Sequence, residues 1–432
     1  MKRAVVLAFC GVLFACSPVA GDWARFLGPN GQGAPDSDRP ITTDLSSKEN
    51  LRWRAALPGS GTSSPIVVGD RVYVTAYTGY GLDMADPGDE SKLVRHLLSF
   101  DRESGEELWR ASVESEGKIL PFRGFVCQHG YASSTPTSDG ENIYVLFGST
   151  GLIKFNRDGK EVWRTSLGNQ TDPAGYGDGS SPVVWKDYVL VNASAIGRQL
   201  VAVDQSTGKV VWSIEDESFT NSWSSPVTTQ TSNGDRVLFG VPGKILGVDP
   251  SNGKQVWSAV TPLNDAVCGS ISIKDDVAYI MGGRAGNAIA IRMGGEGDVS
   301  DTHTQWQTSL RSGICTPVML GETLYWCSGG IFYAADAKTG EYVYKKRLPR
   351  LGGPTGGFPN ADYSSPVTSG ETIVQFTRNG ESYVVQSGDE FKTVAHNPAF
   401  EDDGTSFSSS PAISEGEVFI RSEKYLYRIA KP

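Results

Sequence analysis

The side chains best suited to chemistry in this 432-residue sequence are six cysteines, four histidines and a short run of carboxylates. The densest group is Cys127-Gln128-His129-Gly130-Tyr131. A cysteine near a histidine suggests a thiolate nucleophile, but such pairs assemble from distant parts of a chain rather than from positions two apart. We therefore expect Cys127 to be a structural thiol or a disulfide partner, and His129 a loop side chain with a partner of its own.

The spacing of these residues gives little support for a metal site. No cysteine lies in a C-x-x-C arrangement, and His96, His129, His303 and His396 are scattered, so no zinc site is expected. The run from residue 401 to 403 is Glu-Asp-Asp, which offers oxygen ligands but lacks the alternating pattern of a calcium loop. We interpret it as solvated charge.

The first twenty residues are typical of a secretory signal peptide, because Met1-Lys2-Arg3 precedes an apolar stretch too short to span a bilayer permanently. Leu13-Phe14-Ala15-Cys16 resembles a bacterial lipobox, in which Cys16 is lipidated. Pro18-Val19-Ala20 resembles an ordinary cleavage site instead. We favour the lipoprotein, and expect an exported protein of the periplasm or outer membrane that meets the membrane only through lipid.

Export allows disulfides among the remaining cysteines, Cys127, Cys268, Cys315 and Cys327. Cys268 and Cys315 lie near the start of the innermost strands of successive units of a repeat described below, where the strands converge, so the two are candidate disulfide partners. Cys327 is the rival partner for Cys315, because the two lie across one predicted hairpin.

Composition indicates short strands and many turns, with 51 Gly, 23 Pro and 10 Trp. The net charge of −10 leaves no positive field for a phosphate backbone, which argues against nucleic-acid binding.

A repeat organises the chain. A Ser-Ser-Pro-like triplet opens a strand-like segment eight times, and after a first, longer gap the copies recur every 44–49 residues. The second residues of the triplets are Ser64, Thr135, Ser181, Ser225, Ser270, Thr316, Ser365 and Ser410. Each triplet leads into a hairpin, as at Gly69-Asp70, and then into a second hairpin with the pattern Asp-x-x-x-Gly-x-x-x-Trp.

Each unit therefore predicts four antiparallel strands, with glycine in the last turn and tryptophan covering the face between neighbouring sheets. Stacking such units around an axis gives an all-β, eight-bladed propeller over residues 51–432. The last unit lacks a fourth strand, whereas Leu51-Arg52-Trp53-Arg54 supplies one. We expect the N-terminal strand to close the ring, with residues 21–50 as an N-terminal extension.

The decapeptide Val203-Asp204-Gln205-Ser206-Thr207-Gly208-Lys209-Val210-Val211-Trp212 resembles the PQQ-like repeat of quinoprotein alcohol dehydrogenases and their relatives. The resemblance covers essentially all of residues 51–432. Trp23-Ala24-Arg25-Phe26-Leu27-Gly28-Pro29 looks like the opening of secreted PQQ-like propellers of planctomycete-type bacteria. The size, the blades and the lipobox also resemble the BamB family, propeller lipoproteins of the outer-membrane β-barrel assembly machinery.

These resemblances imply different functions. A quinoprotein dehydrogenase would hold PQQ beside a vicinal Cys-Cys pair, and Ca²⁺ in a Glu, Asn and Asp set. No two cysteines are adjacent here and no acidic constellation stands out at a blade position, so no cofactor or metal is expected, although PQQ and Ca²⁺ stay open. The BamB resemblance implies a scaffold, but none of that family's partner-binding residues maps onto this chain.

Blade-to-blade connections emerge on one face of such a propeller, here called the top, and the long segments 77–95, 112–131, 345–362 and 394–407 fall mostly there. Residues just before the triplets should ring the mouth of the central channel and hold a small polar ligand or a peptide. They include Arg123, His129, Tyr131, Tyr176, Asp178, Asn221, Trp223, Asp265, Arg311, Asp362, Tyr363 and Phe407.

The sequence thus favours a monomeric, non-catalytic binding or scaffold propeller of the bacterial cell envelope. A PQQ-dependent oxidoreductase is the alternative. A carbohydrate-binding or carbohydrate-cleaving propeller is a third possibility, which would need paired carboxylates across the channel mouth.

Overall fold

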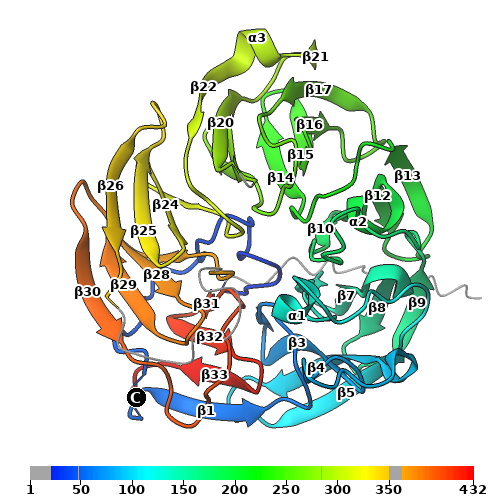
Figure 1. Ribbon diagram of the computed structural model, residues 1–432, viewed down its shortest axis with the longest axis vertical. Helices are drawn as coiled ribbons and strands as arrows, with labels where there is room; N and C mark the ends of the chain where they lie inside the picture. The colour runs from blue at the N-terminus through cyan, green and yellow to red at the C-terminus, as the bar shows by residue number, and fades with distance from the viewer. Residues whose placement is uncertain (1–20, 47, 284, 350–361) are drawn as a thin grey trace, which may run out of the picture.

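The computed structural model describes residues 21–46, 48–283, 285–349 and 362–432. Eight antiparallel sheets are arranged in a ring around a central axis (Figure 1). The predicted eight-bladed propeller is therefore confirmed. The signal peptide and Cys16 lie outside the described residues.

The blades are numbered in chain order, and each runs from an inner to an outer strand. Blade 1 holds β2 (Ile66–Val68), β3 (Arg71–Thr78), β4 (Val94–Asp101) and β5 (Glu107–Glu114). Blade 2 holds β6 (Thr137–Ser138), β7 (Asn142–Leu146), β8 (Leu152–Asn156) and β9 (Glu161–Thr165). Blade 3 holds β10 (Val183–Trp185), β11 (Tyr188–Asn192), β12 (Gln199–Asp204) and β13 (Val210–Glu215). Blade 4 holds β14 (Val227–Thr231), β15 (Gly234–Val241), β16 (Lys244–Val248), β17 (Gln255–Val260) and β21 (Gly297–Asp298).

The second half of the ring continues the order. Blade 5 holds β18 (Ser272–Lys274), β19 (Val277–Gly282), β20 (Asn287–Arg292) and β22 (Thr304–Ser309). Blade 6 holds β23 (Val318–Leu320), β24 (Thr323–Ser328), β25 (Ile331–Asp336) and β26 (Tyr342–Arg347). Blade 7 holds β27 (Val367–Ser369), β28 (Thr372–Phe376), β29 (Ser382–Gln386) and β30 (Lys392–Asn397). Blade 8 holds β31 (Ala412–Ser414), β32 (Glu417–Arg421), β33 (Tyr425–Ile429) and β1 (Leu51–Ala56).

The ring closes as the sequence predicted. Strand β1 pairs antiparallel with β33, with Leu51 opposite Ile429 and Ala56 opposite Tyr425. In Figure 1 the blue N-terminal strand lies beside the red C-terminal one. Blade 8 is therefore completed from the other end of the chain, and the ring has no unpaired break between its first and last blades.

Tryptophans on the outer strands of five blades join each of those blades to the next. The Trp163 indole N–H donates to the backbone carbonyl of Gln205 at 2.9 Å. Its ring lies against Gly208, whose φ is +71° and where a Cβ would come within 2.7 Å of the indole. The repeat thus requires glycine at this position for two reasons: the positive φ, and the lack of space for a side chain beside the indole. The same bond is made by Trp53, Trp109, Trp212 and Trp306.

Blade 4 departs from the four-stranded prediction. The segment after β20 lacks the Asp-to-Gly turn and instead adds β21 to the outer edge of blade 4, parallel to β17. Trp257 pairs with Gly297 there, and its indole N–H is buried without a partner among the described residues. The missing turn removes the acceptor that the other tryptophans use.

Residues 21–46, here called the N-terminal strap, lie across the bottom of the ring, where the blue segment crosses the centre of Figure 1. Trp23 exchanges two backbone hydrogen bonds with Val67 on β2. Gln32 bonds to Ile273 on β18, and Thr368 on β27 donates to Gly33. Further bonds reach β6, β14 and β31. The strap therefore ties inner strands from both halves of the ring together.

The remaining elements are short. They are α1 (Val126–His129), α2 (Ser194–Gly197), α3 (Ser300–His303), η1 (Glu90–Lys92) and η2 (Gly148–Thr150). Among the described residues, no helix is long and apolar enough to cross a membrane.

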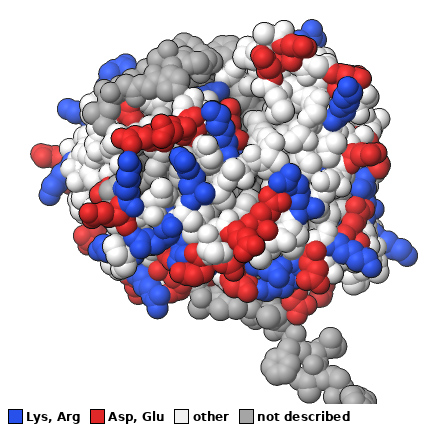
Figure 2. Space-filling model, turned by 90° about the horizontal axis from the view of Figure 1, so that it is seen from below, with Lys and Arg blue, Asp and Glu red and all other residues white. Residues whose placement is uncertain are grey.

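The hydrophobic core is divided between the blades, as buried clusters from facing sheets. Figure 2, which views the ring edge-on from below, shows Lys and Arg interspersed with Asp and Glu on that edge. Several of these charges pair across strands and blades, as Arg102 with Glu417 at 3.0 Å and Arg428 with Glu103 at 2.9 Å. This mixed edge offers no single-sign field for a polyanion.

Candidate ligand-binding site

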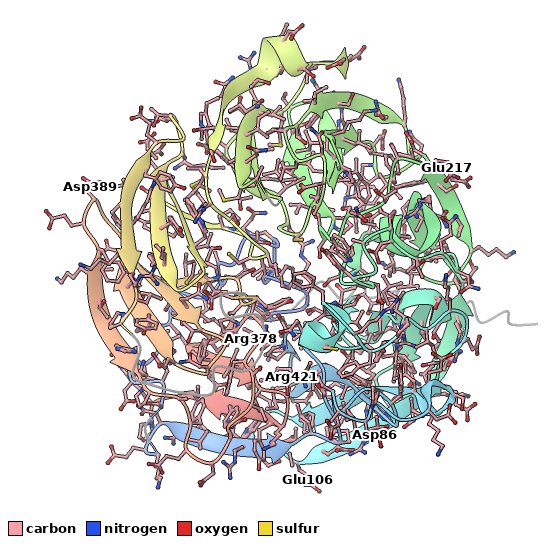
Figure 3. The ribbon with its side chains drawn as sticks, in the orientation of Figure 1. Asp86, Glu106, Glu217, Arg378, Asp389 and Arg421 are labelled. Atoms are coloured by element: carbon pink, nitrogen blue, oxygen red, sulfur yellow. The ribbon has the colours of Figure 1, made fainter. Side chains whose placement is uncertain are left out.

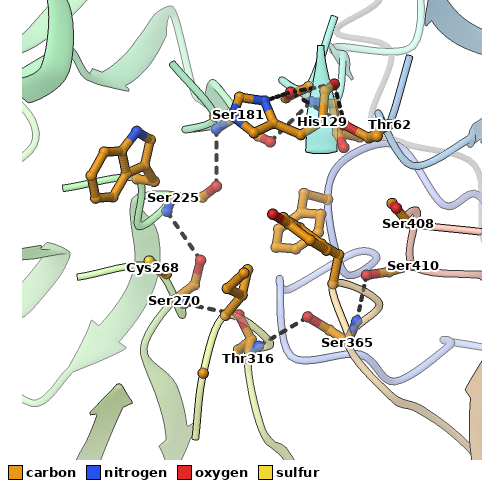
Figure 4. A pocket seen from close by; sticks show the side chains of 18 of the residues that line it. Thr62, His129, Ser181, Ser225, Cys268, Ser270, Thr316, Ser365, Ser408 and Ser410 are labelled. Carbon is orange, nitrogen blue, oxygen red and sulfur yellow. Dashed lines mark hydrogen bonds between the residues drawn. The ribbon is translucent and has the colours of Figure 1, made fainter. Parts of the chain in front are cut away.

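A circle of hydroxyl groups surrounds the channel axis. In each blade, the backbone N–H of the second triplet residue donates to the side-chain oxygen of the equivalent residue in the next blade, at 2.8–3.0 Å. The bond from Ser410 to Ser64 closes the circle. Figure 4 shows part of it, from Ser181 to Ser410. We call these eight residues the hydroxyl ring, because the repeat places a Ser or Thr at every position.

The hydroxyl ring lines a cavity of about 830 Å³ in the upper part of the channel. This volume suits a drug-sized ligand. The connections between blades form its walls, and Phe26 from the N-terminal strap lines it as well. Since the strap crosses the bottom of the ring, it gives the channel a protein floor.

Six of the twelve residues expected to ring the channel mouth line this cavity. They are His129, Tyr176, Asp178, Trp223, Asp362 and Tyr363. The other six, Arg123, Tyr131, Asn221, Asp265, Arg311 and Phe407, are not among its lining residues. Tyr131 is buried beside the cavity, where it packs on Tyr77 and Tyr80 and its hydroxyl donates to Leu120. Arg123, Asp265 and Arg311 are exposed to solvent.

His129 is held in one neutral form. Its Nε2 lies 2.6 Å from the backbone oxygen of Tyr176, so Nε2 carries the proton, and Nδ1 accepts from the Ser133 hydroxyl at 2.7 Å. Burial lowers the pKa of His129. The expectation that this histidine has partners of its own is confirmed. Burial raises the pKa of the Cys127 thiol, which argues against a reactive thiolate beside it.

One wall of the cavity is aromatic. Trp223 and Tyr176 lie with ring centres 5.5 Å apart, and Phe125 packs on Tyr176 at 4.5 Å. The Trp223 indole N–H donates to the backbone oxygen of Gly177 at 2.6 Å, which fixes the ring. These rings come from the connections before blades 2, 3 and 4, so the wall spans three neighbouring blades.

Two carboxylates line the cavity from opposite sides of the ring. Asp178 lies in the connection between blades 2 and 3, and Asp362 in the one between blades 6 and 7. Burial raises the pKa of Asp178, although Arg95 and His129 partly oppose that shift. Asp362 accepts a hydrogen bond from the Gly330 N–H at 2.8 Å.

The disulfide suggested between Cys268 and Cys315 is not formed, and all four described cysteines are free. The Cys315 thiol donates to the backbone oxygen of Cys327 at 3.0 Å, inside its own blade. The Cys327 thiol lies 3.6 Å from Oδ2 of Asp362. Each of these thiols therefore has an acceptor other than a second sulfur, and the rival pair is not bonded either.

The sequence suggested that the acidic run at 401–403 is solvated charge. The structure contradicts this for one of its three residues. Asp403 is buried, and its carboxylate accepts hydrogen bonds from Tyr427 and Thr405. It is a structural acceptor for Tyr427 on β33 of blade 8. Glu401 and Asp402 are exposed as expected. Among the described residues, no group of three or more His, Cys, Asp or Glu could hold a metal ion.

Sequence reasoning missed the hydroxyl ring and Phe26 as cavity residues. The repeat marked Ser64 and its counterparts as strand openers, and only the fold shows that their side chains meet around one axis. A signal was present, since a small hydroxyl residue recurs at all eight positions.

Comparisons with known proteins place this architecture in a family. The family model for the outer membrane protein assembly factor BamB matches residues 95–346, more than half of the chain. The chain belongs to this family. A relative named outer membrane protein assembly factor BamB, from Moranella endobia (strain PCIT), is 27% identical over 234 residues, which are 53% of this chain and 51% of the relative. The chain thus matches about half the length of that BamB.

Solved structures share the fold. BamB from Moraxella catarrhalis has a TM-score of 0.60 at 14% identity, covering 88% of this chain and 99% of that one. A europium-containing methanol dehydrogenase scores 0.65 at 11% identity, covering 95% and 98%. The quinohemoprotein alcohol dehydrogenase from Comamonas testosteroni scores 0.64 at 13% identity, covering 96% and 81%. At these identities the likeness shows the fold alone.

The cavity does not fit the quinone cofactor that quinoprotein enzymes would imply. PQQ carries three carboxylates, and a site that binds it is expected to offer basic side chains as hydrogen-bond donors to them. The described lining residues include two carboxylates and no Lys or Arg, and His129 is neutral. An acidic, aromatic lining is unsuited to a trianion, so no reaction step is derived through PQQ.

Proposed function

We propose that this protein is a non-catalytic binding module of the bacterial cell envelope that holds protein partners on the top face of its propeller. Membership of the BamB family carries this proposal. The loops on the top face have the elaboration that partner recognition requires, while the strap and the mutually bonded blades keep them on a rigid base.

The alternative of a PQQ-dependent oxidoreductase keeps some support from the fold shared with quinoprotein dehydrogenases. The charge of the cavity opposes it. Adding PQQ and Ca²⁺ to the purified protein tests this alternative, since stoichiometric binding with dye-linked alcohol oxidation would make the protein an enzyme.

Affinity capture from envelope extracts of the native host tests the proposal. The full chain should retain a defined envelope protein, and Arg123→Glu on the top face should weaken its capture. Glu106→Lys, a charge reversal on the outer edge of blade 1 (Figure 3), is the control and should leave capture unchanged. Equal loss in both variants, or no retained protein, would count against a top-face partner.

An exported location and a lipid anchor at Cys16 form part of the same proposal. In this proposal the protein is a monomer, and it contacts the membrane only through its lipid anchor. Globomycin treatment, which blocks the lipoprotein signal peptidase, should leave an unprocessed precursor if Cys16 is lipidated, and should change nothing if the cut follows Ala20.

A further inference from the structure

We propose that the cavity at the top of the channel binds an organic cation, a group with a positively charged nitrogen on an apolar body. The cavity is lined by five aromatic residues and two carboxylates, with no Lys or Arg among the described residues. This proposal goes beyond partner binding on the top face, because it concerns a ligand inside the channel and holds whether or not a protein binds outside it.

The first step is the sign of the charge. Asp178 and Asp362 enter the cavity from connections four blades apart, so both sides of the ligand would meet a carboxylate. His129 donates its only ring proton to a carbonyl and adds no positive charge. An anion in this space would therefore meet repulsion from two sides without a compensating basic lining residue.

The second step concerns the guanidinium groups behind the lining. Arg95 donates to the Tyr131 carbonyl and to the Ser115 and Thr150 hydroxyls, and its charge faces Asp178. Asp178 is therefore partly neutralised by the protein itself.

Two further arginines, Arg378 and Arg421, lie near the centre of the ring in Figure 3. Both interact electrostatically with the half-buried carboxylate of Glu423. Arg421 also donates to the backbone oxygens of Thr75 and Ser422. The Arg378 guanidinium lies 5.3 Å from the ring centre of Tyr363. Since Nε and Nη1 of Arg378 have no partner among the described residues, an anion beside it is the competing interpretation.

Asp362 is the cavity carboxylate that no described basic side chain neutralises. Its Oδ2 accepts from the Gly330 N–H and faces the Cys327 thiol. No Lys or Arg in the described part of the chain forms an ion pair with it. Within that part, its other carboxylate oxygen has no hydrogen-bond donor, and such an oxygen at a cavity wall is a natural partner for an ammonium group.

The aromatic wall supplies the second attraction. Trp223 and Tyr176 line the cavity from the opposite half of the ring to Asp362, and the indole is fixed through its N–H. Aromatic faces attract cations through their quadrupole, and tryptophan does so most strongly. The apolar body of the ligand would meet Phe26 and Phe125, while the hydroxyl ring would accept or donate to polar substituents.

Titration calorimetry on the purified full chain tests the charge requirement with matched probes. Choline and its uncharged isostere 3,3-dimethylbutan-1-ol have the same shape, Nα-acetyl-lysine N-methylamide presents a side-chain ammonium, and PQQ is the anion. We expect choline or the lysine derivative to bind at one site about tenfold or more tighter than the isostere. Binding of choline indicates a free small cation, and binding of the lysine derivative alone indicates a side chain of a partner.

Equal binding of choline and its isostere overturns the proposal, as does binding of PQQ without the cations, or no binding by any probe. These results leave capture of an envelope partner untouched, so the two proposals fail separately.

Two variants tie the binding to the cavity. Asp362→Asn removes the charge while its amide oxygen can still accept from Gly330, and Trp223→Leu removes the aromatic face; each should weaken binding of the tighter cationic probe about tenfold. Asp389→Asn is the matched control on the outer end of the same blade 7, at the left edge of Figure 3, and should bind as the unchanged protein does. Thermal unfolding confirms that each variant folds. Unchanged affinity in both cavity variants overturns the proposal.

Discussion

The cysteines show how a residue with reactive chemistry is made inert by its place in the fold. Cys268 lines the cavity and Cys315 lies in the next blade, and burial raises the pKa of each thiol to about 12. The carboxylate of Asp265 adds to this effect at Cys268. A thiol that stays protonated near neutral pH is a poor nucleophile, so the ligand that we propose for the cavity would be held by shape and charge rather than by a bond to Cys268.

Alkylation of Cys268 tests this protection. Because only the thiolate reacts, the rate should rise about 100-fold between pH 8 and pH 10 for a pKa of about 12, against about fourfold for an ordinary thiol of pKa about 8.5. Mass spectrometry of iodoacetamide-treated protein measures the rate, and Cys268→Ser identifies the peptide. A rate that levels off above pH 9 would contradict the buried-thiol interpretation.

His96 should make folding stability depend on pH. It bonds to Thr78 and Ser112 inside blade 1, and burial lowers its pKa from 6.5 to about 4. The unfolded chain then binds a proton that the folded chain refuses, so stability is lost as the pH falls from about 6.5 towards 4. Urea unfolding across this range should show a shallower decline for His96→Gln. The control His303→Gln, at the end of α3, should decline as the parent does.

At the scale of the elements, the repeat is a device for joining blades. The glycine of one blade receives the indole of the preceding blade, and the indole N–H is satisfied by a backbone oxygen nearby. The sequence could predict this because both residues recur at fixed spacing. It could not predict that blade 4 gains β21, because that strand is added by a segment with no repeat signal.

Gly208→Ala should be much more destabilising than Gly321→Ala. Both residues have positive φ, +71° and +63°, but a Cβ at Gly208 would lie 2.7 Å from Trp163, whereas nothing lies within 4 Å at Gly321. Backbone strain alone costs about 1 kcal/mol, and crowding the indole adds about 1–3 kcal/mol. Chemical denaturation measures both, and equal losses would show that the indole contact is unimportant.

The N-terminal strap should contribute to stability as well as to the cavity floor. Trp23 is fully buried against blade 1, so Trp23→Ala should lower the free energy of unfolding by about 3–5 kcal/mol. Trp185→Ala is the control, because Trp185 is only partly buried on β10. The strap interpretation fails if the two substitutions cost the same.

At the scale of the whole molecule, the sequence predicted the number of blades, their strand order and the closure by Leu51-Arg52-Trp53-Arg54, because each depends on local patterns that repeat. The site was predicted in part. His129 and Trp223 precede triplets and line the cavity. Arg123 and Arg311 also precede triplets in the sequence, but their side chains do not line the cavity. The path of a loop depends on what it packs against, and no periodic signal reports that.

The floor of the channel was outside the reach of sequence reasoning for a similar reason. The strap is a single copy, so nothing in the repeat indicates that it crosses the bottom of the ring and brings Phe26 to the cavity. Its path follows from hydrogen bonds to inner strands far away in sequence. The strap covers the bottom of the ring, so the top face is the side on which we propose that recognition occurs.

Site-specific photo-crosslinking in the native host tests that placement most directly. A photoreactive amino acid at Arg123, on the top face, should give a discrete cross-linked envelope protein. The same amino acid at Glu106, in the turn between β4 and β5 at the edge of the ring in Figure 3, should give none. Cross-links from Glu106 but not from Arg123 would contradict the central claim that this propeller binds its partner through the top face.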